Sequence, residues 1–193
     1  CIRDSNLELF ETMRTKEKRG SLLWVLDHTK TAMGARMLRQ WMSKPLRSPN
    51  QIVQRQKAVG ELKDDLVRRT ALADELRQMF DIERLIGRIV YGTANCRDMR
   101  SMFATLEHVP EIRIQLAQCQ SSMLQVLCES MDELQDIKQL IDAAIVDDPP
   151  FSLREGGFIQ NGYSEELDKL RDIASGGKGS IAAIEERERE ATG

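Results

Sequence analysis

The stretch Gly176-Gly177-Lys178-Gly179-Ser180 is the part of this sequence that most resembles a phosphate-binding loop. Such loops follow the pattern GxxxxGK[ST] after a strand, and their backbone amides then surround the phosphate groups. Here Gly179 separates Lys178 from Ser180, and no strand pattern precedes the glycines. We therefore expect neither nucleotide binding nor ATPase activity from this stretch.

Two histidines and two pairs of acids are the other groups that could serve acid–base chemistry. His28 and His108 are far apart in the sequence, and neither stands in an HExxH pattern. Asp27 directly precedes His28, but adjacent residues of a helix point to different faces, so this pair is a poor general base. The pairs Asp64-Asp65 and Asp147-Asp148 lie at predicted helix boundaries, where capping explains them better than catalysis. We expect no catalytic residue.

The cysteines are poor candidates for a metal site. They stand at positions 1, 96, 119 and 128, without any CxxC pattern, and the chain has only two histidines. Zinc sites need four such ligands at characteristic spacings. We expect reduced thiols, a cytoplasmic protein, and no metal or cofactor in this stretch.

The net charge of −3 hides a difference between the two halves of the chain. Residues 1–100 carry 20 Lys and Arg against 13 Asp and Glu, whereas residues 101–193 carry 8 against 18. A basic half can contact phosphate or an acidic partner, but these charges are interspersed, which is typical of solvated helix faces. Because aromatic residues for base stacking are scarce, we expect at most weak, sequence-blind affinity for DNA.

The composition favours helices. Apolar residues make up 41% of the chain, enough for a core, and aromatic residues only 5%, while Leu, Ile and Met abound. No uninterrupted apolar run approaches the ~18 residues of a membrane span. The chain begins at Cys1 without a leader pattern and ends on Thr192-Gly193 after a charged stretch, so we expect both ends to be boundaries of an excised segment.

Residues that cap helices mark most of the predicted helix starts. Ser21 and either Thr29 or Thr31 precede apolar stretches, and Asn95 supplies a further side-chain acceptor. Ser48-Pro49-Asn50-Gln51 combines a capping box with proline at the first helical position. The apolar residues behind these starts recur at helical spacing and predict the following buried stripes: Met33, Met37, Leu38 and Trp41; Ile52, Gln56, Val59 and Leu62; Leu66, Ala73, Leu76 and Phe80; Ile82, Leu85, Ile86 and Ile89; Met99, Met102, Phe103 and Leu106; and Leu134, Ile137, Ile141 and Ile145.

Two short regions have strand patterns. Leu7 and Leu9 alternate with polar residues, and residues 151–153 and 158–160 flank Gly156-Gly157 in the manner of a small β-hairpin. The predicted fold class is therefore mainly α, an irregular multi-helix domain with a small β-hairpin and a long C-terminal helix.

The last thirty residues predict a helix of a different kind. Ser164, followed by two glutamates, is a good helix start. The apolar residues then follow at intervals of 3, 4, 3, 4 and 3, which is a heptad seam that needs a partner helix rather than a core; they are Leu167, Leu170, Ala174, Gly177, Ile181 and Ile184. Each glycine in the seam costs ~1 kcal/mol relative to alanine. Left unpaired, this helix is expected to fray beyond Gly176-Gly177, fold back, or pair with another copy.

An ordered series of short motifs spans essentially the whole chain. It opens with Leu22-x-x-x-Leu26-Asp27-x-Thr29-x-Thr31-x-Met33-Gly34-x-Arg36-x-Leu38-x-x-Trp41, which closes on Pro45-Leu46. Its later members are Ile52-x-x-Arg55-Gln56-x-x-Val59, Asp81-Ile82-Glu83-Arg84-Leu85-x-x-Arg88, Thr93-Ala94-Asn95-x-Arg97-Asp98, Pro149-Pro150, Gly156-Gly157-x-Ile159-x-x-Gly162-Tyr163, Glu166-Leu167-Asp168-x-Leu170-Arg171 and Glu185-x-Arg187-x-Arg189-x-x-Thr192-Gly193. In this order the motifs resemble domain III, the core and connector, of bacterial MutS-type DNA mismatch-repair proteins. The sequence departs from the family pattern at Cys96, where proline often stands, and at Ser180, where an aromatic is common.

The resemblance implies a division of labour along the chain. Residues 1–150 are expected to form the helical core or connector, and residues 151–193 a hairpin and an ascending lever helix that leads to a clamp domain. In such proteins this segment couples ATP state and mismatch binding to the clamp, which needs packed, rigid elements rather than reactive side chains. Structural roles are implied for Gly34 in close helix approach, and for Arg36 and Trp41 in tying the connector together. The other motif residues carried over as structural are Asp81, Arg84, Arg97, Asp98, Gly157 and Tyr163.

The partners are implied only for the whole protein. They are its other domains, duplex DNA, ATP with Mg²⁺ and a second copy, with no membrane. Which residues, if any, contact DNA is unknown. The alternative is a free-standing α-helical protein-interaction scaffold, which the seam and the Met-rich stripes would support, although at helical spacing these stripes fit an ordinary core better.

Overall fold

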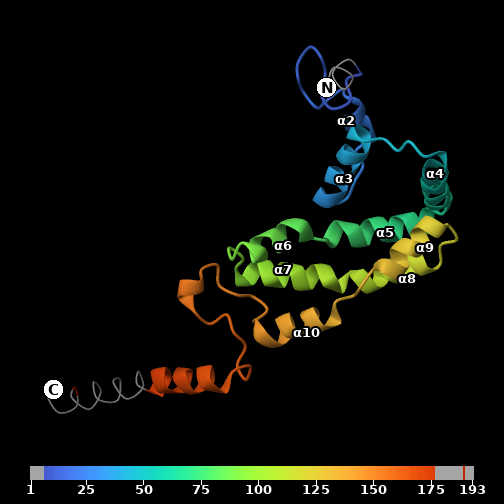
Figure 1. Cartoon of the computed structure of the whole chain (residues 1–193). Coiled ribbons are helices and arrows are strands. Elements are labelled where there is room, and N and C mark those ends of the chain that lie inside the picture. The colour runs from blue at the N-terminus through green and yellow to red at the C-terminus, as the bar shows by residue number, and fades with distance from the viewer. Residues whose placement is uncertain (1–6, 177–188, 190–193) are drawn as a thin grey trace.

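The computed structural model describes residues 7–176 and Arg189, and within them the chain is an extended assembly of helices (Figure 1). An arm containing α2 and α3 lies at one end, a central stack from α4 to α9 follows, and the helix at residues 165–176 lies at the other end. The accessible surface of the chain is 14096 Å², whereas a compact monomer of this mass exposes roughly 9300 Å². The fold thus leaves much surface for neighbours to cover.

The arm begins with two capped helices. Helix α2 (Leu22–Leu26) starts after Ser21, whose hydroxyl accepts the Trp24 N–H, and α3 (Ala32–Ser43) starts after Thr31, whose hydroxyl accepts the Gly34 N–H at 2.9 Å. Of the two threonines that the sequence left open, Thr31 is therefore the cap. None of the twelve residues of α3, all described, is fully buried.

Two rows of helices form the middle of the central stack, as Figure 1 shows: α5 (Leu66–Gln78) and α6 (Ile82–Val90) in one, and α7 (Cys96–Glu107) and α8 (Val109–Ala117) in the other. Helix α4 (Pro49–Asp64) stands upright at the end of α5, and α9 (Ser122–Ser130) packs on α8 and α4. Helix α10 (Gln135–Ala144) packs on α7. The predicted start at Asn95 is confirmed, with a complete capping box between Asn95 and Asp98. Helix α4 begins at Pro49 as predicted, but Ser48 makes no side-chain cap bond.

The core lies where α4, α5, α8 and α9 meet. Its buried members are small or aliphatic: Ala58, Leu72, Ile112, Leu116, Cys119 and Leu124. Thr105 of α7 is completely buried as well, and its hydroxyl accepts the Phe80 N–H at 3.0 Å and donates to the Ser101 carbonyl. Burial also raises the pKa of the Cys119 thiol, which keeps it protonated and unreactive.

The predicted stripes of α3, α4 and α5 are only partly buried: Leu62 and Leu76 pack against the core, as predicted, but other members face solvent. Met37, Val59 and Leu66 are each more than half exposed, and Phe80 is half exposed, while Ala58 and Leu72 are the residues that α4 and α5 bury. Both helices carry apolar residues on more than one face, so spacing alone could not select the face that packs. The contacts of α4 with α9 and of α5 with α8 select it instead.

The predicted β-hairpin at residues 151–160 is wrong. Ser152 and Glu155 cap each other around a 3-10 turn (Leu153–Glu155), which takes the first half out of strand conformation. The second half pairs with the end of α10: Ile159 forms an isolated antiparallel bridge with Ile145, supported by bonds from Val146 N to Phe158 O and from Gln160 N to Ala144 O. The strand predicted at Leu7 and Leu9 is also wrong, since residues 7–11 form turns and bends.

The C-terminal helix starts after Ser164, as predicted, and is described through residue 176. Along the seam Leu167 is half-buried, but Leu170 and Ala174 are exposed. The remaining seam positions, Gly177, Ile181 and Ile184, lie outside the described residues. None of the described helices is both long and apolar enough to cross a membrane.

Glu61, near the end of α4, joins that helix to the start of α9. Its two carboxylate oxygens accept the N–H groups of Gln120 at 2.5 Å and Ser121 at 2.8 Å. The hydrogen bond from Gln120, together with that from Ser121, lowers the pKa of Glu61. A carboxylate from a neighbouring helix thus caps α9, whose own N-cap Ser121 makes no side-chain cap bond.

We predict that Glu61→Gln destabilises the fold by about 1.5–3 kcal/mol at neutral pH, the usual worth of hydrogen bonds to a charged group. Because the folded-state pKa is lowered, this contribution is present above the unfolded pKa of about 4.3 and is lost as pH falls through the folded value. Urea unfolding at pH 7 and at low pH measures it, with the exposed Glu129→Gln as control. Equal losses in the two variants, or a Glu61→Gln loss that persists in acid, would contradict the prediction.

Candidate functional site

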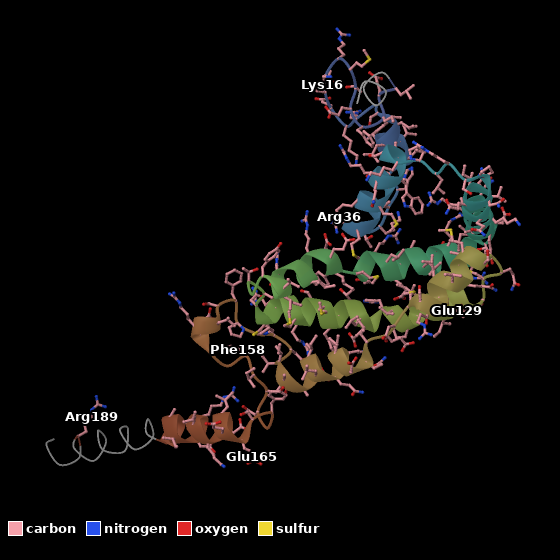
Figure 2. The ribbon with its side chains drawn as sticks, in the orientation of Figure 1. Lys16, Arg36, Glu129, Phe158, Glu165 and Arg189 are labelled. Atoms are coloured by element: carbon pink, nitrogen blue, oxygen red, sulfur yellow. The ribbon has the colours of Figure 1, made fainter. Side chains whose placement is uncertain are left out.

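Within the described residues, three polar joints centred on arginine link the arm, the central stack and the terminal helix. The N-terminal joint is Arg36 with Asp81 and Glu83, the central joint is Arg97 and Arg100 with residues 147–149, and the C-terminal joint is Arg171 with residues 159–161. Figure 2 shows the side chains along this path.

At the N-terminal joint, Arg36 of α3 forms hydrogen bonds with two acids at the start of α6. Its two terminal nitrogens each donate to Asp81 at 2.7 Å, and Nε donates to Glu83 at 2.9 Å. Asp81 also caps α6, accepting the Arg84 N–H at 3.3 Å. The bonds from Arg36 lower the pKa of Asp81, and those from Asp81 and Glu83 raise the pKa of Arg36. Two forked bonds fix orientation as well as distance, which a lysine could not do.

Trp41 and Gly34 make contacts within the arm and its linker. The Arg55 guanidinium of α4 lies 3.4 Å from the Trp41 ring centroid, a cation–π contact that holds the end of α3 against α4. A Cβ on Gly34 would lie 3.0 Å from the Thr31 hydroxyl and 3.5 Å from Thr29, so the close approach at Gly34 is to the preceding loop. No second helix comes that near to it among the described residues.

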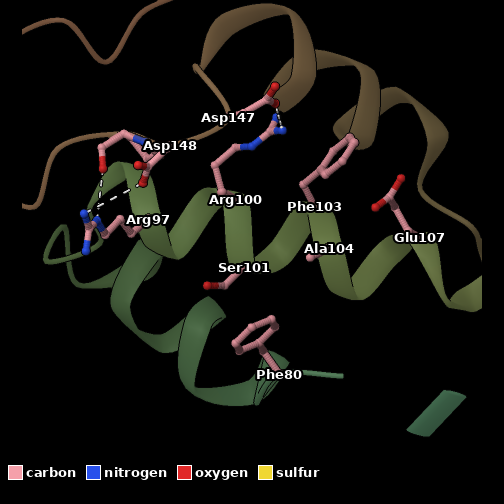
Figure 3. Close-up of a pocket in the computed structure, with 10 residues that line it drawn as sticks. Phe80, Arg97, Arg100, Ser101, Phe103, Ala104, Glu107, Asp147 and Asp148 are labelled. Carbon is pink, nitrogen blue, oxygen red and sulfur yellow. Dashed lines mark hydrogen bonds and ion pairs between the residues drawn. The ribbon is translucent and has the colours of Figure 1, made fainter. Parts of the chain in front are cut away.

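At the central joint, two arginines one turn apart on α7 hold the segment that follows α10 (Figure 3). Arg97 donates to the Pro149 carbonyl at 3.0 Å and lies 3.9 Å from Asp148. Arg100 donates to Asp142 at 3.1 Å and also to Asp147. The Arg100 guanidinium in addition stacks on Phe103, 4.5 Å from the ring centroid.

Asp98 lies beside this joint but faces the other way. It is 7% exposed, closes the capping box with Asn95, and pairs with Arg88 of α6. The neighbouring residues Arg97 and Asp98 therefore connect α7 to two different segments, residues 147–149 and α6.

At the C-terminal joint, Arg171 holds the terminal helix to the chain before it. It donates to the Ile159 carbonyl and to the Asn161 side chain, both at 2.8 Å, and pairs with Asp168 at 3.2 Å. Asp168 in turn accepts the Gly162 N–H at 2.7 Å. Since Ile159 is bridged to Ile145, the base of this helix is bound to the end of α10.

The other motif residues are placed around this joint. Gly156 and Gly157 have φ of +69° and +74°, conformations that favour glycine and reverse the chain before Phe158. Tyr163 is about half exposed, and its N–H donates to the Gln160 carbonyl.

Sequence reasoning brought out only part of this arrangement. Arg36, Asp81 and Arg84 do come together, and Arg97 and Asp98 lie at one end of α7. Arg100 and Glu83 were not singled out. The spacing of three residues between Arg97 and Arg100 on one helix face was a usable signal, whereas Glu83 lies two residues from Asp81, which gives no such signal. Within the described residues no group of three or more His, Cys, Asp or Glu side chains could hold a metal ion.

Comparison with known proteins agrees with these motifs. Residues 5–192 match the model of the family described as MutS domain III. The chain is 50% identical over 188 residues to the DNA mismatch repair protein MutS of Brevibacillus brevis, covering 97% of this chain and 22% of that protein. It is 45% identical to the protein of the same name from Lachnoclostridium phytofermentans, covering 97% and 20%. The chain thus spans about a fifth of the length of these relatives. With a family match over nearly its whole length, the chain belongs to the MutS domain III family.

Proposed function

We propose that this chain is the connector of a DNA mismatch-repair protein, a structural element that passes changes of position between an arm at one end and a lever helix at the other. The single observation that carries this proposal is the series of arginine joints that runs from α3 to the helix at residues 165–176. Rigid helices held by a few polar contacts move as blocks, as coupling between distant sites requires.

The proposed roles of the two parts of the chain rest on the same contacts. Residues 1–150 serve as the core and residues 151–193 as the start of the lever, although the bridge between Ile145 and Ile159 ties the two parts together. Action on DNA in mismatch repair is proposed for the whole protein, in keeping with the names of these relatives. ATP hydrolysis and dimerisation are proposed for it from the resemblance of the ordered motifs to the family. For this chain we propose no catalytic step.

The alternative, a free-standing interaction scaffold, has the exposed apolar residues of the arm and terminal helix in its favour. The family match favours the connector, because the same surfaces are then covered by neighbouring domains of one protein.

We predict that Arg171→Ala loosens the base of the terminal helix. Removal of its bonds to Ile159 and Asn161 should speed amide exchange at Gln160 and at residues 167–170 by about three- to tenfold, since these amides are hydrogen-bonded at the base of the helix. Lys169→Ala is the matched control, since Lys169 is 75% exposed and lies 3.9 Å from Glu165. Exchange that rises equally in both variants would argue against a C-terminal joint.

A second prediction tests the connector role itself. The matched segment of the Brevibacillus brevis protein is replaced by this chain, and the chimera is introduced into bacteria that lack their own mismatch-repair protein. The intact chimera should lower the mutation frequency. Arg36→Ala or Arg100→Ala should remove most of that effect, because each joint fixes one block against the next, whereas the exposed Arg47→Ala should not.

Expression level and circular dichroism of the purified chains show whether a variant still folds. Loss of repair in a folded variant is then due to the broken joint and not to unfolding. If folded Arg36→Ala and Arg100→Ala chimeras both repair as well as the intact one, the joints do not transmit position and the connector proposal is wrong.

A further inference from the structure

A groove of about 680 Å³ lies between the loop that precedes α3 and the face of α5. Its floor is the edge of the core: Leu72, Leu76, Ile112 and Leu116 all line it. The opposite wall consists of residues 28–31 and Gly34. An apolar floor in an open groove of this size is suited to a ligand with an apolar face.

The charged residues that line the groove are all basic. Lys30, Arg69 and Arg77 line it, and no Asp or Glu does so among the residues that the structure describes. Arg69 donates to the carbonyls of Leu62 and Lys63, which leaves its charge without an acidic partner in the described chain. Arg77 pairs with Asp74, which is not part of the lining. The groove therefore favours an anionic ligand.

The length of the groove and the residues of its walls indicate which kind of anionic ligand fits. The α5 residues that line it run from Arg69 to Arg77, about two helical turns or ~12 Å. Thr29, Thr31 and Gly34 of the opening motif line the other side, so this motif forms one wall. A Cβ at Gly34 would press on Thr31 at 3.0 Å and distort that wall.

We propose that this groove is a docking site for a short amphipathic acidic helix of a partner segment. The apolar face of the helix lies on Leu72 and Leu76, and its carboxylates face Lys30 and Arg69, the helix-in-groove mode of recognition. The site goes beyond the connector role, since the residues of the three joints do not line it. Binding can therefore be measured whether or not the joints transmit position.

The test uses a labelled synthetic peptide with leucines at i, i+3, i+4 and i+7 and glutamates on the flanking positions. Fluorescence anisotropy with the full chain should show saturable binding, and the scrambled peptide of the same composition should bind at least about tenfold more weakly. Replacing the glutamates by glutamines should weaken binding to a similar extent, because the basic rim then lacks its partners.

Two variants place the site on the protein. Lys30→Glu and Thr70→Glu put an acid on each wall and should each weaken peptide binding by about tenfold or more. Lys57→Glu, the same charge change at an exposed residue outside the groove, should leave it within about twofold. The proposal fails if the peptide does not bind, if the scrambled peptide binds equally, or if folded Thr70→Glu binds as well as wild type. It also fails if only a small apolar anion such as anilinonaphthalene sulfonate binds.

Discussion

The position of the N-terminal arm depends largely on one guanidinium. Helix α3 buries none of its residues against the described chain, so its orientation relies on the forked bonds from Arg36 to Asp81 and Glu83 and on the stack of Arg55 on Trp41. Forked bonds are directional, whereas apolar contact is not. Helix α3 is consequently fixed in angle although none of its residues is fully buried. The walls of the groove beside it keep their separation for the same reason.

The central stack is built on the opposite principle. Ala58, Leu72, Ile112 and their neighbours exclude water from α4, α5, α8 and α9, and Glu61 adds a charged cap where two of these helices meet. Close packing makes this part resist deformation, while the joints at its ends hold their segments through a few directional polar bonds. A stiff centre with directionally held ends suits the connector role proposed above.

The sequence was informative where the physics is local. Ser21, Thr31, Pro49 and Asn95 start helices because a capping oxygen or a fixed proline φ acts within one turn. Burial is decided between helices, and so the predicted faces of α4 and α5 were only partly right: Leu62 and Leu76 reach the core, but Val59 and Leu66 are exposed. The hairpin failed likewise, because residues 158–160 found a partner at Ile145 rather than in the adjacent stretch. Ordered motifs identified the family and contained some residues of each joint, but Glu61 gave no signal, since its partners are backbone amides about sixty residues away.

Because the joints are ion pairs and hydrogen bonds rather than apolar contacts, temperature and ionic strength affect them differently. Separating Arg97 from Asp148 exposes almost no apolar surface, because the carboxylate lies in water and the arginine side chain is already half exposed. Such a change carries little heat capacity, so temperature shifts its equilibrium only slightly. Ionic strength acts on it directly through screening. The apolar core of the central stack should instead be sensitive to temperature and insensitive to ionic strength. The temperature dependence and the salt dependence of this chain are therefore separate properties, and selection can change one without the other.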